Sequence, residues 1–190
     1  SIARADALGR IGVGPDSAGS VPGPACYARG GTDPTVTDAD AALGRLDPGR
    51  FAGGSIPLDL DRAAAALAGL GAALGLNAAG AAAGVAEIVD ETMASAARVH
   101  AVENGKDTAD RTLIAFGGAA PLHAARLARK LGMARVVVPL GAGVGSAQHL
   151  QGELVKQRTG SDIVHVPYRG ATLAILDILA GRIDFMMTNM

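Results

Sequence analysis

Strand-like apolar runs alternate with helical stretches from residue 111 to the end of the chain, and this alternation limits the possible folds most strongly. The runs RTLIAF, ARVVVP and DIVHVPY are each followed by a glycine-containing turn and a stretch with helical spacing. Strands that alternate with helices in this way are typical of parallel sheets with crossover helices. The sequence therefore predicts an α/β fold with a predominantly parallel sheet, with strands near residues 112–116, 134–138 and 162–167.

The first part of the chain has sequence features typical of irregular structure followed by helices. Residues 1–36 are rich in Gly, Pro and Ser, which predicts irregular structure with short strands at SIARAD and RIGVG. Three helices should follow, at residues 38–46 with Thr37 or Asp38 as the cap, at about Asp59 to Leu74, and at about Ala79 to Glu103. Spacing predicts that the last helix buries one apolar face and ends at Gly105; the face comprises Val85, Ile88, Val89, Met93, Ala96 and Val99.

Composition excludes several classes of protein. The 190 residues carry a formal net charge of -1, so we expect no nucleic-acid partner. A charge-free run from Ala63 to Ala86 consists mostly of Ala and Gly and is interrupted by GLNAAG, which favours two helices over a membrane span. A single cysteine and an N-terminus without an apolar signal core favour the interior of a longer, cytoplasmic protein.

Several residues with chemical potential have simple structural interpretations. The four histidines, His100, His123, His149 and His165, show no metal-ligand spacing. Cys26 lies in a Gly-Pro loop, where a packed side chain is favoured over a catalytic thiol. Asp38 and Asp40 are interpreted as charges at a helix start rather than as an acid-base pair. No metal site is therefore expected.

The turn after the strand RTLIAF is the sharpest candidate site. Two glycines, Gly117 and Gly118, follow Phe116, and Pro121 begins a helix. Glycines allow a ligand to approach the backbone, and the first N–H groups of a helix favour anions. By itself the local pattern favours a tight turn that binds nothing.

Two long motifs carry a resemblance to a known family. The stretch GPDSAGSVPGPACYARGGTDPTVTDADAALGRLDPGRF and the later stretch IAFGGAAPLHAARLARKLGMARVVVPLGAGVGS resemble the ATPase-type subunit of the hydantoinase and 5-oxoprolinase family. The resemblance covers residues 1–146. It implies part of an actin-like ATPase fold and an ATP-dependent activation of cyclic amides, with a partner hydantoinase or oxoprolinase subunit.

The same resemblance assigns candidate cofactor-binding residues. Gly117, Gly118 and Ala119 correspond to the turn that lies against the nucleotide in actin-like ATPases. ATP and Mg²⁺ are the implied cofactors, but the Asp-Gly loops that hold phosphate and Mg²⁺ in such enzymes do not occur in this sequence. The family also usually has Gly where this chain has Ala120, and an aromatic residue near Arg4. These departures predict an incomplete site that is inactive alone.

Residues 147–190 resemble a different family, the solute-binding proteins of tripartite tricarboxylate transporters. That resemblance implies a short β-α-β-type extension and a carboxylate ligand facing Tyr168 and Arg169. The string GAGVGS at residues 141–146 satisfies both families, because AGVGS commonly precedes HL in the solute-binding proteins and GAGV commonly follows the strand in the hydantoinase and 5-oxoprolinase family. We therefore interpret it as a junction rather than as a phosphate loop. The domain prediction is therefore 1–146 and 147–190.

Three functions remain open at this point. The first is a partial ATP-dependent hydantoinase or oxoprolinase subunit that acts on a small cyclic amide. The second is a carboxylate-binding module of a tripartite tricarboxylate transporter. The third is a chimeric chain with no activity of its own. Coverage favours the first, because its motifs extend over most of the chain.

Overall fold

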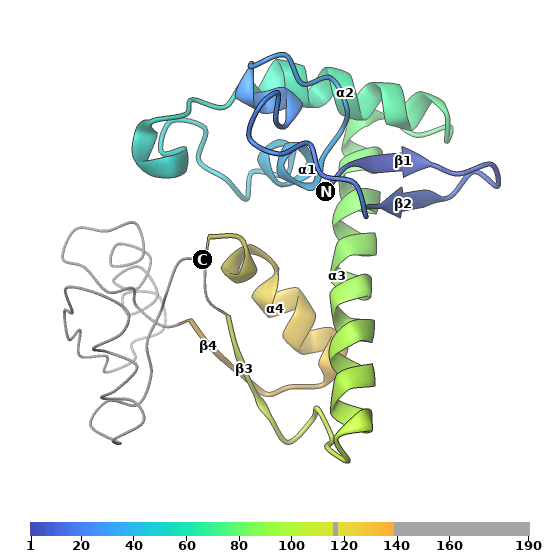
Figure 1. The fold of residues 1–190 in the computed structure, drawn as a ribbon, viewed down its shortest axis with the longest axis vertical. Coiled ribbons are helices and arrows are strands. Elements are labelled where there is room, and N and C mark those ends of the chain that lie inside the picture. The colour runs from blue at the N-terminus through green and yellow to red at the C-terminus, as the bar shows by residue number, and fades with distance from the viewer. Residues whose placement is uncertain (116–117, 139–190) are drawn as a thin grey trace. The chain divides into compact units, whose positions relative to one another are not determined.

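The computed structural model describes residues 1–115 and 118–138, and divides the chain into two compact units, Ser1–Ala96 and Ala97–Met190 (Figure 1). Each unit is described by itself below. The domain boundary expected after residue 146 lies outside the described residues and stays a prediction.

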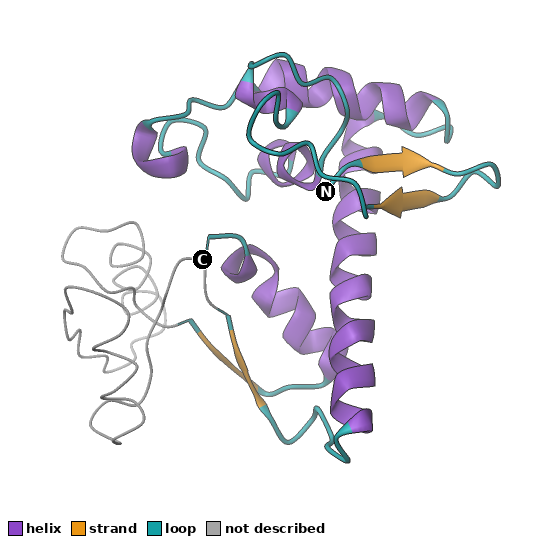
Figure 2. Ribbon diagram, in the orientation of Figure 1, coloured by secondary structure: helices purple, strands orange, loops and turns teal. Residues whose placement is uncertain are grey.

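The first unit begins with a small antiparallel hairpin. Strand β1 (Ala3–Ala5) pairs with β2 (Ile11–Val13), with Ala3 opposite Val13. A 3-10 helix, η1 (Ala25–Tyr27), lies in the following loop segment, which Figure 2 shows together with the other irregular parts of this unit. The two short strands expected in this region are confirmed, although each contains only three residues.

Helix α1 (Val36–Ala42) begins earlier than expected. Thr35 is its N-cap, and a reciprocal capping box joins the Thr35 hydroxyl to the Asp38 N–H and the Asp38 carboxylate to the Thr35 N–H. The prediction that Thr37 or Asp38 caps the helix is therefore wrong. The reason is that an Asp three residues after a Thr satisfies two helix-terminal N–H groups at once, which neither alternative cap does.

The charge-free run forms two helices, as expected. Helix α2 (Leu60–Ala72) has Asp59 as its N-cap, and α3 (Ala78–Glu103) follows after a short turn. Gly105 has a φ of +63°, and its N–H donates to the Val102 carbonyl, which confirms the expected end of α3. Within the described residues, no helix is long and apolar enough to cross a membrane.

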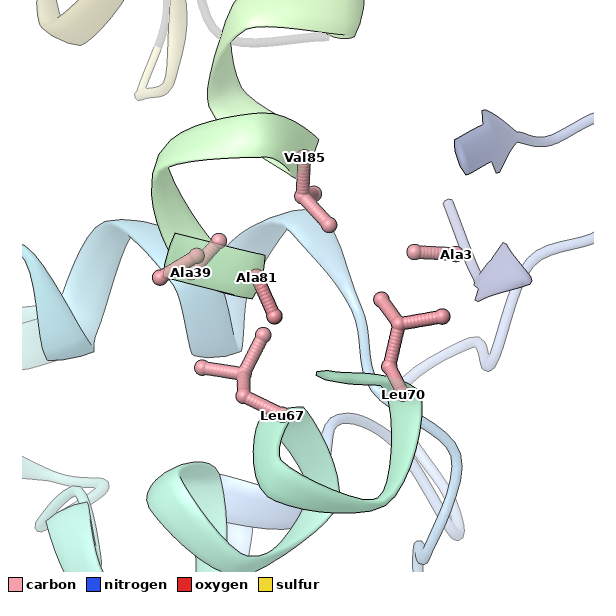
Figure 3. Packing of buried hydrophobic residues seen from close by; sticks show 7 residues of the cluster. Ala3, Ala39, Leu67, Leu70, Ala81 and Val85 are labelled. Carbon is pink, nitrogen blue, oxygen red and sulfur yellow. The ribbon is translucent and has the colours of Figure 1, made fainter. Parts of the chain in front are cut away.

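Small side chains dominate the core of the first unit. Leu67 and Leu70 of α2 pack against Val85 of α3, with alanines filling the spaces between the elements (Figure 3). The buried cluster comprises Ala3, Ala39, Leu67, Leu70, Ala81, Ala82 and Val85. Because alanine occupies little volume, the helices approach one another closely without aromatic side chains.

The buried face of α3 differs from the expected one. Val85 is buried, whereas Ile88 and Val99 are 36% and 56% exposed. The buried residues of this helix are Ala81, Ala82, Val85, Ala86, Asp90 and Ala94. Periodicity alone located the bulky residues, but the close packing of this unit selects the alanine-rich face instead.

Two glycines of α2 give opposite stability predictions. A Cβ added at Gly69, which is exposed, meets no atom of the described residues within 4 Å, so Gly69→Ala should raise the free energy of unfolding by about 0.5–1 kcal/mol through helix propensity. A Cβ added at Gly71 would lie 2.5 Å from the Leu76 carbonyl oxygen, so Gly71→Ala is the control that should destabilise. Urea unfolding followed by circular dichroism measures both variants. A higher free energy of unfolding for Gly71→Ala would contradict the close packing of Gly71 against the Leu76 carbonyl.

The second unit contains strand β3 (Thr112–Ile114), helix α4 (Ala120–Leu131) and strand β4 (Arg135–Val137). The two strands pair in parallel, with Thr112 opposite Arg135, as expected for these two segments. The predominantly parallel sheet stays a prediction, because the described residues form two separate two-stranded sheets, of which the N-terminal one is antiparallel. The expected strand near residues 162–167 lies outside the described part of the chain.

Candidate functional site

The turn between β3 and α4 carries the candidate nucleotide contact. Gly118 and Ala119 are exposed immediately before α4, while Gly117 lies outside the described residues. Ala119 is the N-cap of α4 and makes no side-chain cap, and Pro121 lies in the first helical turn. The Leu122 N–H donates to the Ala119 carbonyl at 3.0 Å. The turn therefore presents backbone rather than side chains.

The described residues leave space around Gly118. A Cβ built at this position meets none of their heavy atoms within 4 Å. The first turn of α4 contains no acidic residue, and its basic residues, Arg129 and Lys130, are in the last turn. An uncompensated helix N-terminus favours an anion, so the turn fits one side of a phosphorylated ligand.

A second cluster lies in the first unit, where the long glycine-rich motif folds around one buried carboxylate. The Oδ1 atom of Asp38 accepts from the Cys26 N–H at 2.7 Å. Its Oδ2 atom accepts from the Thr35 N–H at 2.9 Å, the Thr35 hydroxyl at 2.7 Å and the Ala25 N–H at 3.3 Å. Asp38 is fully buried, so this arrangement serves the scaffold and does not face a substrate.

Asp40 has a separate role from Asp38. Its carboxylate pairs with the Arg45 guanidinium at 2.9 Å, and Asp40 is 3% exposed. The two aspartates therefore hold different partners. Asp38 lies in the first turn of α1, as expected, whereas Asp40 is the fifth residue of this helix, so the interpretation of Asp40 as a helix-start charge is wrong because α1 begins at Val36. Sequence reasoning missed Thr35, although the T-x-x-D spacing of a capping box was the available signal.

Cys26 is a packing residue in the structure. It is 0% exposed and clusters with Ala41, Leu58 and Ala63. Burial, together with the neighbouring Asp38 carboxylate, raises the pKa of the thiol above its ordinary value of 9.0. A thiol kept protonated and away from solvent does not act as a nucleophile at neutral pH.

This shift makes the stability of the chain pH-dependent in alkali. Because the Cys26 thiol ionises more readily in the unfolded chain, its stabilising contribution is complete below about pH 9 and decreases as the pH rises further, by up to about 1.4 kcal/mol per pH unit. Urea unfolding at pH 7, 9 and 10 should show this decrease in stability. The Cys26→Ala variant should lack the part of the decrease that comes from the thiol. An identical slope in the variant would contradict this prediction.

Only two of the four histidines lie in the described part of the chain. His100 is exposed and His123 is buried, while His149, His165, Tyr168 and Arg169 lie outside the described residues. Among residues 1–115 and 118–138, no group of three or more His, Cys, Asp or Glu side chains could hold a metal ion.

Comparison with known proteins decides the family. The family model described as hydantoinase/oxoprolinase matches residues 1–150. The chain belongs to this hydantoinase/oxoprolinase family. A second model, that of the tripartite tricarboxylate transporter family receptor, matches residues 135–190, so the two matches overlap at residues 135–150.

Two relatives of this hydantoinase/oxoprolinase chain are named as enzyme subunits. It is 44% identical over 140 residues to caprolactamase subunit alpha of Pseudomonas jessenii, covering 73% of this chain and 20% of the relative. It is 48% identical over 129 residues to the acetophenone carboxylase gamma subunit of Aromatoleum aromaticum, covering 67% of this chain and 18% of the relative. The chain thus spans about a fifth of the length of these relatives.

Solved structures agree with the sequence relatives. The crystal structure of the ATP-dependent caprolactamase from Pseudomonas jessenii matches 73% of this chain and 20% of that chain, with a TM-score of 0.69 and 44% identity. A nucleotide-free structure of acetone carboxylase matches 74% of this chain and 20% of that chain, with a TM-score of 0.67 and 34% identity. The α/β fold of this hydantoinase/oxoprolinase chain is therefore shared with these two enzymes.

Proposed function

We propose that this chain is a partial ATP-dependent hydantoinase/5-oxoprolinase-type subunit, with part of an actin-like ATPase fold, that takes part in hydrolysis of a small cyclic amide. The observation that carries the proposal is the likeness to the ATP-dependent caprolactamase, at 44% identity and a TM-score of 0.69. The turn at Gly117, Gly118 and Ala119 is proposed as one wall of the nucleotide site.

The chemistry of the proposal depends on activating a poor electrophile. An amide carbonyl resists attack by water, and ATP, when bound, supplies the phosphoryl group that turns its oxygen into a leaving group. The backbone at Gly118 and Ala119 positions the nucleotide, and the N-terminal N–H groups of α4 favour its negative charge. These residues contribute binding and orientation, which are the main protein contributions to phosphoryl transfer.

Turnover of ATP requires more residues than the proposed nucleotide contact supplies. Phosphoryl transfer needs charge neutralisation by Mg²⁺ and by phosphate-binding loops, and the sequence lacks the Asp-Gly loops that supply them in actin-like ATPases. We propose that further hydantoinase or oxoprolinase sequence, including a partner subunit, completes the site. ATP use by the relatives favours a cytoplasmic location.

Residues 147–190 are proposed as a separate segment joined within residues 141–146. The overlap of the two family matches at residues 135–150 supports this position. If the join is an artefact, the chain is a chimera without activity of its own. Sequencing the encoding DNA across codons 135–160 distinguishes an artefact from a natural fusion. The carboxylate-binding alternative depends on Tyr168 and Arg169, and the family it needs matches only residues 135–190.

The Gly118→Val variant tests the nucleotide turn. Because a Cβ at Gly118 meets no atom of residues 1–115 and 118–138 within 4 Å, the variant should retain the fold of these residues and obstruct a ligand. We expect calorimetry to show weak ATP binding by the parent chain and binding at least about tenfold weaker in the variant, a loss of about 1.4 kcal/mol. Gly12→Val is the control, since a Cβ there has its nearest contact at 3.9 Å in strand β2.

Phosphate release tests the incompleteness of the site. With Mg²⁺ and ATP, the purified chain should release phosphate at the background rate whether or not 5-oxoproline, a hydantoin or caprolactam is present. Substrate-dependent release by the parent that Gly118→Val abolishes would show a complete site. Absence of ATP binding by the parent, or equal binding by Gly118→Val, would contradict the nucleotide turn.

A further inference from the structure

The last turn of α3 is closed by a side-chain amide and a glycine. Helix α3 ends at Glu103, and the Asn104 Nδ2 atom donates to the His100 carbonyl oxygen at 2.8 Å. The Gly105 N–H donates to the Val102 carbonyl oxygen at 2.9 Å, with Gly105 at a φ of +63°. Both contacts satisfy carbonyls of the last helical turn. Asn104 and Gly105 together therefore cap this end of the helix.

The same end of α3 lies at a contact between two helix ends of the second unit. The Thr108 hydroxyl donates to the Leu131 carbonyl oxygen at 2.9 Å, and the Arg98 guanidinium donates to the Lys130 carbonyl oxygen at 3.1 Å. Leu131 is the last residue of α4. The end of α3 and the connection after it therefore hold the C-terminal end of α4, and loosening the cap would weaken this attachment.

Asn104 directly precedes a glycine, and this order permits a reaction within the chain. The backbone nitrogen of Gly105 can attack the side-chain carbonyl carbon of Asn104, because glycine has no Cβ to obstruct the approach. That nitrogen loses its proton to solvent, the Cγ–Nδ2 bond breaks, and the released amine takes up a proton and leaves as ammonia. Water then opens the cyclic imide by breaking one of its C–N bonds, which leaves aspartate or isoaspartate. Nothing is oxidised or reduced, and water is the only co-reactant.

The closed cap opposes this reaction, whereas its product opposes the cap. In the closed turn the Gly105 N–H is held by the Val102 carbonyl and the Asn104 amide by the His100 carbonyl. Helix ends open more readily than helix interiors, and both Asn104 and Gly105 are exposed. An aspartate at position 104 has no N–H to donate to His100, and its charge is unfavourable at the negative end of the helix dipole.

We propose that Asn104 is a self-modifying site that permanently opens the end of α3. Deamidation takes place when the last turn frays, and the aspartate that it produces prevents the cap from forming again. The result is a weaker attachment of α3 to α4, produced without an enzyme. Asn77 is a comparison at the other end of the same helix, because it precedes Ala78 and its Oδ1 atom accepts from the Gly80 N–H at 2.8 Å.

Peptide mass spectrometry of the full chain tests the reaction. During incubation at pH 8 and 37 °C, Asn104 should convert to aspartate and isoaspartate about tenfold more slowly than in a free peptide of residues 100–108, because the closed turn protects it. Asn77 should stay an amide over the same period. Equal rates in chain and peptide would overturn the proposal, as would no conversion of Asn104 after about ten times the period that converts the peptide.

Two substitutions that add the same charge separate the cap from charge alone. Asn104→Asp introduces the product and should accelerate amide hydrogen exchange in residues 100–108 by about tenfold, because the last turn loses a donor and gains an unfavourable charge. Asn77→Asp is the control and should leave this exchange unchanged, since a carboxylate keeps the acceptor for the Gly80 N–H and is favoured at a helix start. Parent-like exchange in Asn104→Asp, or equal acceleration in both variants, would overturn the proposal.

Discussion

Replacing Asp38 by alanine should lower the free energy of unfolding of the first unit by about 3–5 kcal/mol. Asp38 is fully buried and accepts hydrogen bonds from the Cys26, Ala25 and Thr35 N–H groups and from the Thr35 hydroxyl. Alanine leaves these donors buried without an acceptor, since water does not reach them. The variant also removes half of the capping box that begins α1.

The single cysteine supplies a local measurement for this effect. Cys26 is the only thiol in the chain and is 0% exposed in the first unit. Its rate of reaction with a thiol reagent therefore reports opening of this unit. Asp61→Ala is the control, because Asp61 is an exposed acid in the first turn of α2 and should cost less than about 1 kcal/mol. If both variants lost a similar amount of unfolding free energy, the hydrogen bonds of Asp38 would not be a main source of stability in this unit.

The Gly31→Ala substitution should destabilise the first unit by at least about 3 kcal/mol. A Cβ at Gly31 would lie 2.0 Å from the Gly23 carbonyl oxygen and 3.2 Å from the Pro24 carbonyl carbon. Both obstacles are backbone atoms, so no side chain can move aside to relieve the contact. The loop that holds Cys26 against Asp38 would have to open.

Gly12→Ala is the matched control for this glycine. Its added Cβ has its nearest contact at 3.9 Å, with the Arg4 carbonyl oxygen, so this variant should remain within about 0.5 kcal/mol of the parent. Urea unfolding followed by circular dichroism and by Cys26 reactivity measures both variants. Parent-like stability of Gly31→Ala would contradict the close backbone approach between Gly23 and Gly31.

Local signals predicted most of the secondary structure of the described residues. Asp59 before an alanine-rich stretch predicted the start of α2, and Gly105 predicted the end of α3. These features depend on neighbours a few residues away, so the sequence contains the whole cause. The cap of α1 was predicted two or three residues too late because the Thr35 signal was overlooked.

The candidate site was predicted only in part. The turn at Gly118 was found from its position between a strand and a helix, and the structure places it there. The open space around Gly118 could not be predicted, because it depends on atoms far away in the sequence. Nucleotide contact at this turn stays a proposal.

The sequence by itself determined the family and, for the described residues, the order of helices and strands. The tertiary structure alone decided that Asp38 is a buried acceptor for the Cys26 loop, and that α3 buries its alanines in place of Ile88 and Val99. The physical reason is the distance along the sequence between the residues that interact. Caps and periodicity arise from bonded neighbours, whereas burial and close packing arise from segments that only folding brings together.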